Sequence, residues 1–388
     1  MNGNHFDVIV IGVGSMGSST CYQLAKSGLK VLGLEQFSIP HEKGSHGGQS
    51  RIIRKAYFEH PDYVPLLERA YASWHELEAA TGEKIYHETG LLYMGLKDNP
   101  LITGVRQSAS LYSIPLDSLG VAELKKRYPV FSVPDQMEIL FEPAAGLLLP
   151  EKIIPLYAAL ARKMGAVIHE GENIIDWQLE GDSVVVKTSK TNYRADRLVL
   201  SAGAGMGRLL PAFKPNLTVT RQVMGWVKPL DPAAFRKHAF PCWTLAEPNG
   251  HSIFYGFPAL DDVDAIGPKG FKLAYHGQGE ETSYDKIDRI PDASDERLLL
   301  DFLNRYMPGT AATAAALKTC RYTNTPDEHF ILGQLPGTAG KVSVASCCSG
   351  HGFKFSSVVG EILRDLTLHG QTDMPVGFLG AERLPKSL

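Results

Sequence analysis

Cys320 stands alone in the segment TCRYTNTPDEHFILG, with Arg321 beside it and Tyr322 two residues further on. A cysteine thiolate is a good nucleophile, and a neighbouring cation favours the thiolate over the thiol. In a reduced protein, however, an isolated cysteine is usually a small buried apolar residue. The segment therefore contains either a reactive thiol or a packed side chain, and the residue types alone do not decide between them.

A glycine-rich motif near the N-terminus, GVGSMG, fits G-x-G-x-x-G at Gly12, Gly14 and Gly17. It follows the strand-like run FDVIVIG and opens a helical pattern, which is the context that gives this motif weight. Gly12 permits a tight turn, Gly14 lets a pyrophosphate approach the backbone, and Gly17 allows close helix–strand packing. Because a helix N-terminus binds phosphate, we expect a dinucleotide site that includes Ser15 and Met16.

An acidic residue ends the second predicted strand, KVLGLEQF. Glu35 lies 18 residues after Gly17, where a carboxylate can bind ribose hydroxyls, and Gln36 follows it. The alternative interpretation is a coincidental glycine-rich turn followed by an acidic residue on the surface. The strand, the spacing and the acid together favour a nucleotide site, although they do not separate NAD from FAD.

A second glycine loop, SGHGFKFS, lies near the C-terminus. Gly350 and Gly352 would let the backbone approach a flat ligand. The helix predicted to begin near Phe353 would point its positive end at that loop. The loop is therefore predicted to hold the ring of a cofactor.

Strand patterns alternate with helical patterns near both ends of the chain. We expect a helix over residues 63–80, strands over residues 86–94 and 137–150, and a helix from residue 156. Residues 216–320 differ, because alternating segments such as SIFYGFPAL and FKLAYH predict antiparallel sheet. The pattern predicts one α/β domain assembled from separated segments, with a mixed-sheet domain inserted between them.

Composition excludes several classes of protein. The 388 residues include 39 basic and 42 acidic side chains, so the net charge of −3 gives no reason to expect nucleic acid or an anionic membrane as a partner. No apolar run approaches the ~18 residues of a membrane span, and the N-terminus lacks the basic region of a signal peptide. Five cysteines without C-x-x-C or zinc-ligand spacing predict a reduced, cytoplasmic protein with no metal.

Four segments together carry a resemblance to a known family: GVGSMG, GSHGGQSRIIRKAY, KLAYH, and CRYTNTPDEHFIL followed by SGHGFKFS. In combination they resemble the monomeric sarcosine oxidase family of flavoenzymes, which includes N-methyltryptophan oxidases and sarcosine/pipecolate oxidases. The resemblance runs from about residue 5 to about residue 380. The segments GQSRIIRKAY and YTNTPDE are most similar to those of the sarcosine/pipecolate members.

The resemblance implies a fold of the glutathione-reductase/D-amino-acid-oxidase type. A Rossmann-like FAD-binding α/β domain would comprise residues 1–85, 146–213 and 318–388. An inserted mixed-sheet substrate-binding domain would comprise residues 86–145 and 214–317. A monomer is implied as well.

The resemblance also implies FAD attached covalently to Cys320, through a thioether to the 8α-methyl group. A thiolate nucleophile suits this bond, which would prevent loss of the cofactor. His46, Ser50 and Arg51 match positions near the flavin ring and the phosphates. Lys354 matches a position that contacts the flavin as well as the substrate.

Arg54 and Lys354 match the family's carboxylate-binding arginine and its lysine partner. A guanidinium fork suits a carboxylate bidentately. Lys272 matches the family's oxygen-activating lysine, since a fixed cation lowers the barrier to oxygen reduction. The alternative is that Arg54 is a surface cation of a solvated loop and that Lys272 points outward from its strand.

Four uncharged positions complete the implied catalytic and substrate-binding residues. His276 and Tyr255 match residues that orient or polarise the amine, while Tyr322 and Thr244 fall in the substrate pocket. A strand-end histidine and a core tyrosine are often only structural. Where family members have a phenylalanine before SGHGF, this chain has Cys348, and Thr244 stands near the sarcosine enzyme's methionine.

We therefore expect an FAD-dependent oxidase of secondary α-amino acids, which transfers a hydride to flavin N5 and passes the electrons to O₂ to give H₂O₂. Three alternatives remain: a dehydrogenase of the same fold that uses an electron carrier, an NAD-dependent dehydrogenase, and a non-enzymatic flavoprotein. Lys272 argues against the first, the cysteine segment and C-terminal loop against the second, and the pocket cations against the third. Sarcosine, larger N-methyl amino acids, L-pipecolate, L-proline and glycated amino acids all fit the carboxylate clamp.

Overall fold

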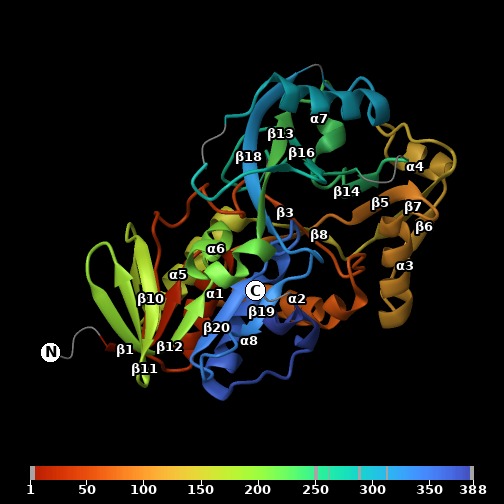
Figure 1. Ribbon diagram of the computed structural model, residues 1–388. Helices are drawn as coiled ribbons and strands as arrows, with labels where there is room; N and C mark the ends of the chain where they lie inside the picture. The colour runs from red at the N-terminus through yellow and green to blue at the C-terminus, as the bar shows by residue number, and fades with distance from the viewer. Residues whose placement is uncertain (1–4, 249–251, 262, 287–289, 312, 385–388) are drawn as a thin grey trace.

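The computed structural model describes residues 5–248, 252–261, 263–286, 290–311 and 313–384, so the predicted domain limits at residues 1 and 388 lie outside it. Two large sheets, each with its own helices, form the lower and upper parts of the molecule in Figure 1. The helices are α1 (Ser15–Lys26), α2 (Val64–Thr81), α3 (Pro100–Tyr112), α4 (Val121–Arg127), α5 (Pro150–Lys163), α6 (Met206–Leu209), α7 (Ala293–Tyr306) and α8 (Ser356–His369). Among the described residues, none of these helices combines the length and the apolar character needed to cross a membrane.

The first sheet has the order β10-β11-β12-β1-β2-β9, with β20 beside β12 and β19 beside β20. Its core strands β9, β2, β1, β12 and β20 run parallel. The strands are β1 (His5–Ile11), β2 (Val31–Leu34), β9 (Val167–His169), β10 (Ile174–Glu180), β11 (Ser183–Thr188), β12 (Asn192–Leu200), β19 (Ile331–Gln334) and β20 (Val342–Ser346). Helix α1 packs between α5 and α8, which buries the apolar face of the predicted βαβ unit.

The close packing of α1 on its strand requires glycine at position 17. A Cβ there would overlap the carbonyl oxygen of Gly12 and lie 2.8 Å from Ser201 Oγ. Gly12 itself has φ +85°, and a Cβ on it would lie 2.6 Å from the carbonyl oxygen of Ser201. Strand, turn and helix are thus held together by backbone contacts that exclude any larger residue.

The second sheet has the order β17-β13-β16-β15-β14-β5-β7-β6, with β18 along the other side of β13. Helix α7 covers it through Leu299, Phe302 and Leu303. A small sheet, β3-β8-β4, is the third. The strands are β3 (Arg51–Ile53), β4 (Tyr86–Glu88), β5 (Leu91–Leu96), β6 (Asp117–Leu119), β7 (Met137–Glu142), β8 (Gly146–Leu148), β13 (Thr218–Val227), β14 (Cys242–Ala246), β15 (Ile253–Gly256), β16 (Phe271–His276), β17 (Glu280–Glu281) and β18 (Ala314–Asn324).

The predicted fold class is confirmed, and so is the helix expected at residues 63–80, which is α2. The antiparallel sheet predicted within residues 216–320 is confirmed, because the strands of this region pair antiparallel with one another. The region also contains the helix α7, which was not predicted although its capping box at Asp292 and its apolar face are helical signals. The pairing of β14 with β5 is parallel, as a mixed sheet allows. The helix expected from residue 156 begins at Pro150 because proline suits the first helical turn.

The two-domain division stays a prediction, and one boundary falls inside a strand. Residue 318 lies within β18, which pairs with β13 along its length. In Figure 1, β18 runs from the upper part toward the lower one. Cys320 is therefore carried on a strand of the second sheet.

We predict that Gly17→Ala lowers the free energy of unfolding by about 1–3 kcal/mol, because the added methyl group must push the Gly12 turn away from α1. Gly120→Ala is the matched control, since its added Cβ meets no atom within 4 Å. Urea unfolding of both variants and the parent checks this. Equal midpoints for Gly17→Ala and the parent would contradict the packing argument.

Candidate active site

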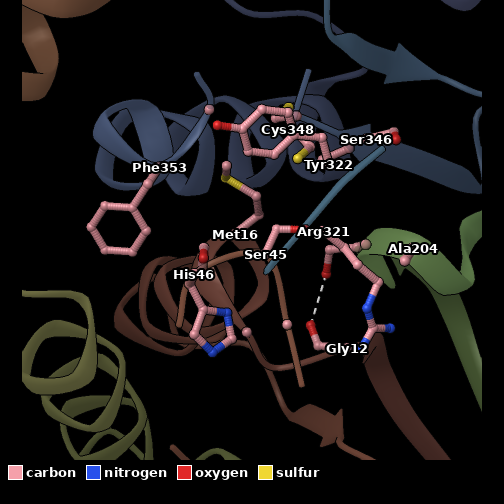
Figure 2. Close-up of a pocket in the computed structure, with 18 of the residues that line it drawn as sticks. Gly12, Met16, Ser45, His46, Ala204, Arg321, Tyr322, Ser346, Cys348 and Phe353 are labelled. Atoms are coloured by element: carbon pink, nitrogen blue, oxygen red, sulfur yellow. Dashed lines mark hydrogen bonds between the residues drawn. The ribbon is translucent and has the colours of Figure 1, made fainter. Parts of the chain in front are cut away.

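A cavity that opens to solvent lies between the two glycine loops. Figure 2 shows Gly12, Met16 and His46 on one side of it and Tyr322, Ser346 and Cys348 on the other. The predicted site residues that line it are Gly12, Gly14, Ser15, Met16, Glu35, Gln36, His46, Arg51, Arg54, Thr244, Tyr255, His276, Tyr322, Gly350, Gly352, Phe353 and Lys354. Segments far apart in the sequence thus meet at one site.

The N-terminal loop leaves its backbone open to a ligand. A Cβ on Gly14 would meet only the ring of His46, at 3.5 Å. The Glu35 carboxylate accepts hydrogen bonds from the backbone N–H of Val13 at 2.9 Å and of Phe37 at 3.1 Å. Burial raises the pKa of Glu35, and these two donors oppose that rise. Glu35 therefore also stabilises the backbone of the glycine loop through Val13, a role that its spacing from Gly17 did not predict.

The C-terminal loop forms the facing wall. Gly350 has φ +77°, and a Cβ there would lie 2.6 Å from both His276 Cε1 and Tyr322 Cε2. Ser346, at the end of β20, lines the cavity with a buried hydroxyl that has no partner among the described residues. An unpaired buried hydroxyl is costly unless a ligand completes it. Sequence reasoning missed Ser346, although its place before the glycine loop was a signal.

The loop that carries His46 and Arg51 is held by charged side chains on several sides. Arg51 donates to the carbonyl oxygens of Ser45 at 3.0 Å, Gly47 at 2.6 Å and Ser50 at 2.8 Å. His46 is buried, and its Nε2 lies 3.0 Å from a backbone carbonyl oxygen of the same loop. Burial, and then the charge of Arg51, lower the pKa of His46 to about 4. The imidazole is therefore neutral near pH 7.

Two more charged residues reach the same loop from outside it. Lys272 Nζ donates to the carbonyl oxygens of Gly48 at 2.6 Å and Ser50 at 2.8 Å. Glu151 Oε1 accepts from the backbone N–H of Gly48 at 2.7 Å and of Gln49 at 2.8 Å. No motif or spacing in the sequence pointed to Glu151. Together these bonds fix the loop between β16 and α5.

Lys272 is almost completely buried, and its ammonium lies 4.5 Å from the centre of the Phe257 ring. Burial and the neighbouring charge of Arg51 lower its pKa well below the ordinary lysine value. The charge of Glu151 opposes that lowering, but among the described residues Lys272 donates only to carbonyl and hydroxyl oxygens. A buried ammonium is costly without a close anion, so the site favours the arrival of negative charge.

Cys320 does not line the main cavity but a second groove, with Gly48 and Met224. The thiol is buried. Burial raises its pKa, and the charges of Arg51, Lys272 and Arg321 only partly offset that rise. We expected Arg321 to favour the thiolate. In the structure, the effect of its charge on the pKa of Cys320 is smaller than the effect of burial.

Arg54 already holds a carboxylate from its own chain. Its Nη2 lies 2.6 and 2.8 Å from the two carboxylate oxygens of Glu59, and its guanidinium lies 4.2 Å from the centre of the Tyr57 ring. Burial alone would raise the pKa of Glu59, but Arg54 and the nearby His351 and Lys354 lower it to about 2. Glu59 lines the cavity and was missed, because the motif containing it offers no spacing that identifies a partner for Arg54.

Among the described residues, the hydrogen-bond acceptors of Lys354 are neutral. Its Nζ donates to the carbonyl oxygen of His351 at 2.6 Å and to the Tyr57 hydroxyl at 3.4 Å. Burial and the charge of Arg54 lower its pKa well below the ordinary lysine value. The cavity wall beside Arg54 is therefore suited to an added anion.

His276 faces this wall with two tyrosines. Its Nδ1 lies 3.3 Å from the Tyr322 hydroxyl, and its ring centre lies 6.5 Å from that of Tyr255. Burial lowers the pKa of His276 to about 4, so the ring is uncharged near pH 7. Thr244 donates to the carbonyl oxygen of Leu92 at 3.3 Å and borders the same cavity.

The fold and the cavity define a protein built around an extended dinucleotide cofactor. The turn at Gly12 suits a pyrophosphate, while the Gly350 loop and the unpaired Ser346 suit a flat ring system with polar edges. Residues 7–366 match the family model described as DAO, FAD dependent oxidoreductase. The chain belongs to this family of FAD-dependent oxidoreductases.

Individual relatives agree with the sequence-based resemblance. A monomeric sarcosine oxidase of Bacillus sp. (strain B-0618) is 39% identical over 386 residues, which cover 98% of this chain and 96% of the relative. An N-methyl-L-tryptophan oxidase of Citrobacter koseri (strain ATCC BAA-895 / CDC 4225-83 / SGSC4696) is 34% identical over 93% of this chain and 94% of its own. The structure of NikD, an unusual amino acid oxidase essential for nikkomycin biosynthesis, superposes with a TM-score of 0.85 at 23% identity, covering 99% of this chain and 100% of that one.

The pKa of Glu59 makes a prediction for acid stability. Its folded value of about 2 lies below the ordinary 4.5, so between these values the unfolded chain binds more protons. We therefore expect the Arg54–Glu59 pair to stabilise the fold fully above about pH 4.5 and to lose a few kcal/mol of that stability as the pH falls toward 2.

Glu59→Gln should flatten the pH dependence of the unfolding free energy in that window and lower stability at pH 7, because Arg54 stays buried without its anion. Glu68→Gln is the control, since it removes an exposed ion pair with Lys55. Urea unfolding from pH 2 to 7 measures both effects. An unchanged slope in Glu59→Gln would show that Glu59 titrates normally.

Proposed function

We propose that this protein is an FAD-dependent oxidase of secondary α-amino acids, with N-methyl or cyclic amines as its substrates. The observation that carries the proposal is the cavity wall that brings together Arg54, Lys354 of the C-terminal glycine loop and neutral His276. The relatives named monomeric sarcosine oxidase and N-methyl-L-tryptophan oxidase support the same reaction class. We also propose a cytoplasmic monomer, in line with the name of the first relative.

Arg54 and Lys354 would bind the substrate carboxylate. Lys354 forms no ion pair among the described residues, although the charge of nearby Glu59 favours its ammonium form, so a substrate carboxylate would add to that stabilisation. Arg54 is held by Glu59 and stacked on Tyr57, which fixes its guanidinium in place. A fixed clamp of this kind orients the amino acid for reaction.

His276 would act on the amine. An uncharged imidazole can accept a hydrogen bond or a proton from the ammonium group of the substrate, and Tyr322 holds the ring through Nδ1. The amine loses one C–H and one N–H bond, and with them two electrons and two protons, to give an imine. O₂ takes up two electrons and two protons to give H₂O₂. Bound FAD would supply the hydride acceptor and the path of these electrons to oxygen.

The alternative of a dehydrogenase that passes electrons to a carrier is less consistent with Lys272. Its ammonium is fixed by Gly48 and Ser50, buried, and without a carboxylate partner in the described parts of the chain. A preorganised cation favours the development of negative charge on oxygen during reduction. A non-enzymatic flavoprotein would have no use for this cation together with the carboxylate clamp.

Substrate size depends on residues that differ from the pattern of the family. Cys348 and Thr244 are short side chains at the cavity, where the family resemblance leads us to expect phenylalanine and methionine. Shorter side chains leave more room, so substrates larger than sarcosine fit the proposal. Cyclic L-pipecolate and L-proline remain candidates beside N-methyl amino acids.

We also propose that FAD is attached covalently to Cys320, so the yellow colour should stay with acid-precipitated protein. In Cys320→Ser the flavin should pass into the supernatant while the fold is retained, since a buried serine replaces a thiol of similar size. Cys348→Ser is the matched control and should keep the colour in the pellet. Equal retention in Cys320→Ser and the parent would refute the attachment site.

The role of Lys272 predicts a selective defect in Lys272→Met. Reaction of the reduced protein with oxygen should slow by roughly 10²-fold, while reduction by substrate changes far less, because the cation acts on oxygen. Stopped-flow absorbance measures both half-reactions separately. Equal slowing of both would argue that Lys272 only maintains the loop at Gly48.

A further inference from the structure

The nucleotide end of the cavity is bordered by residues from both large sheets. Glu35 and Gln36 follow β2 of the first sheet, and Arg208 lies in α6, which follows β12 of that sheet. Tyr284 comes from the other side, three residues after β17 of the second sheet. All four residues line the main cavity.

Tyr284 contacts the first-sheet side at three points. Its hydroxyl donates a hydrogen bond to Oε1 of Gln36. The guanidinium carbon of Arg208 lies 5.4 Å from the centre of its ring. Its ring edge lies against Gly205, where an added Cβ would be 3.2 Å from Tyr284 Cε2. The ring therefore spans the space between the two parts of the molecule.

Both ends of this bridge are anchored. On one side, β17 pairs with β13, and the N–H of Thr282 donates to the carbonyl oxygen of Val219 at 2.8 Å. On the other side, Arg208 Nη2 donates to the carbonyl oxygen of Ile174 at 2.9 Å and to Asn173 Oδ1 at 3.3 Å. Because each sheet holds its own partner, opening of the border at this end of the cavity would break the Tyr284 contacts.

We infer that Tyr284, with Gln36 and Arg208, forms a clasp over the nucleoside end of the bound dinucleotide, which enters and leaves when these contacts open. Glu35 marks the ribose position, and Gln36 is the next residue. A tyrosine ring stacked with a guanidinium provides flat surfaces suited to a purine base. The inference rests on FAD being the cofactor of the proposed function.

The clasp has a kinetic signature that a simple binding contact lacks. If opening must precede both entry and exit, weakening the closed state speeds association and release by similar factors, and affinity changes little. A residue that only contacts the cofactor would change the release rate and the affinity, with little effect on association. The two rates together therefore separate a clasp from a contact.

The test measures FAD exchange in a Cys320→Ser background, so that no thioether holds the cofactor. Flavin fluorescence gives the rate of FAD uptake by the apoprotein and the rate of release from the loaded protein. Tyr284→Ala should raise both rates about tenfold, the order expected when one hydrogen bond and one cation–π contact are lost. Tyr284→Phe keeps the ring and should raise both about threefold. Asp285→Ala, an exposed neighbour, should leave both rates unchanged.

Faster release without faster uptake would overturn the clasp, and so would rates equal to the parent in Tyr284→Ala. A Cys320→Ser protein that folds but binds no FAD would contradict the cofactor itself, which separates failure of the proposed function from failure of the clasp. Should Cys320→Ser not fold, FAD uptake by flavin-free protein with Cys320 intact gives the test. A tenfold faster uptake in Tyr284→Ala is expected there, and equal uptake would refute the clasp.

Discussion

The contact on which the rest of the site depends is the bond between the buried ammonium of Lys272 and the loop at Gly48 and Ser50. Through it, a strand of the second sheet holds the segment that carries His46 and Arg51. Glu151 holds the same loop from α5 through the N–H groups of Gly48 and Gln49. Lys272 thus satisfies carbonyl oxygens of this loop, and Glu151 satisfies N–H groups of the same loop. The loop would otherwise leave polar groups buried and unpaired.

The three buried cations Arg54, Lys272 and Lys354 differ in how their charge is balanced. Arg54 is neutralised by Glu59 within the chain, while Lys272 and Lys354 have only neutral partners among the described residues. Burial then works against the ammonium form of each lysine. Two places are therefore suited to negative charge, one on the cavity wall at Lys354 and one at the buried Lys272 behind the Gly48 loop. These are the places at which the proposed chemistry needs a carboxylate bound and oxygen reduced.

The sequence predicted the parts of this structure that depend on local backbone geometry. Gly12, Gly17 and Gly350 were identified because a turn or a close approach requires glycine, and the structure places a backbone or ring atom where each Cβ would be. Glu59 and Glu151 could not be predicted, because each acts through a partner that only the fold brings close. The helix α7 was not predicted, because the segments around it have strand patterns, although Asp292 and Asp295 form its capping box.

The desolvation of Cys320 was also beyond the sequence. Arg321 beside it suggested a thiolate, but the side chain is enclosed by the second sheet, and burial outweighs the nearby cations. Local charge can be read from neighbours in the chain, whereas burial depends on which strands pair. The same reason explains the low pKa of His46 and His276, which their sequence positions did not indicate.

The most direct test of the central claim is a single turnover with the flavin-loaded protein. The protein is mixed without oxygen with a secondary amino acid such as sarcosine, L-proline or L-pipecolate, and the yellow absorbance is followed before and after air is admitted. An oxidase of secondary amino acids should bleach with at least one of them, and on aeration should recover its colour with release of one H₂O₂ per flavin. A flavin that bleaches but stays reduced in air would identify a dehydrogenase, and a flavin that no N-methyl or cyclic amino acid bleaches would contradict the account.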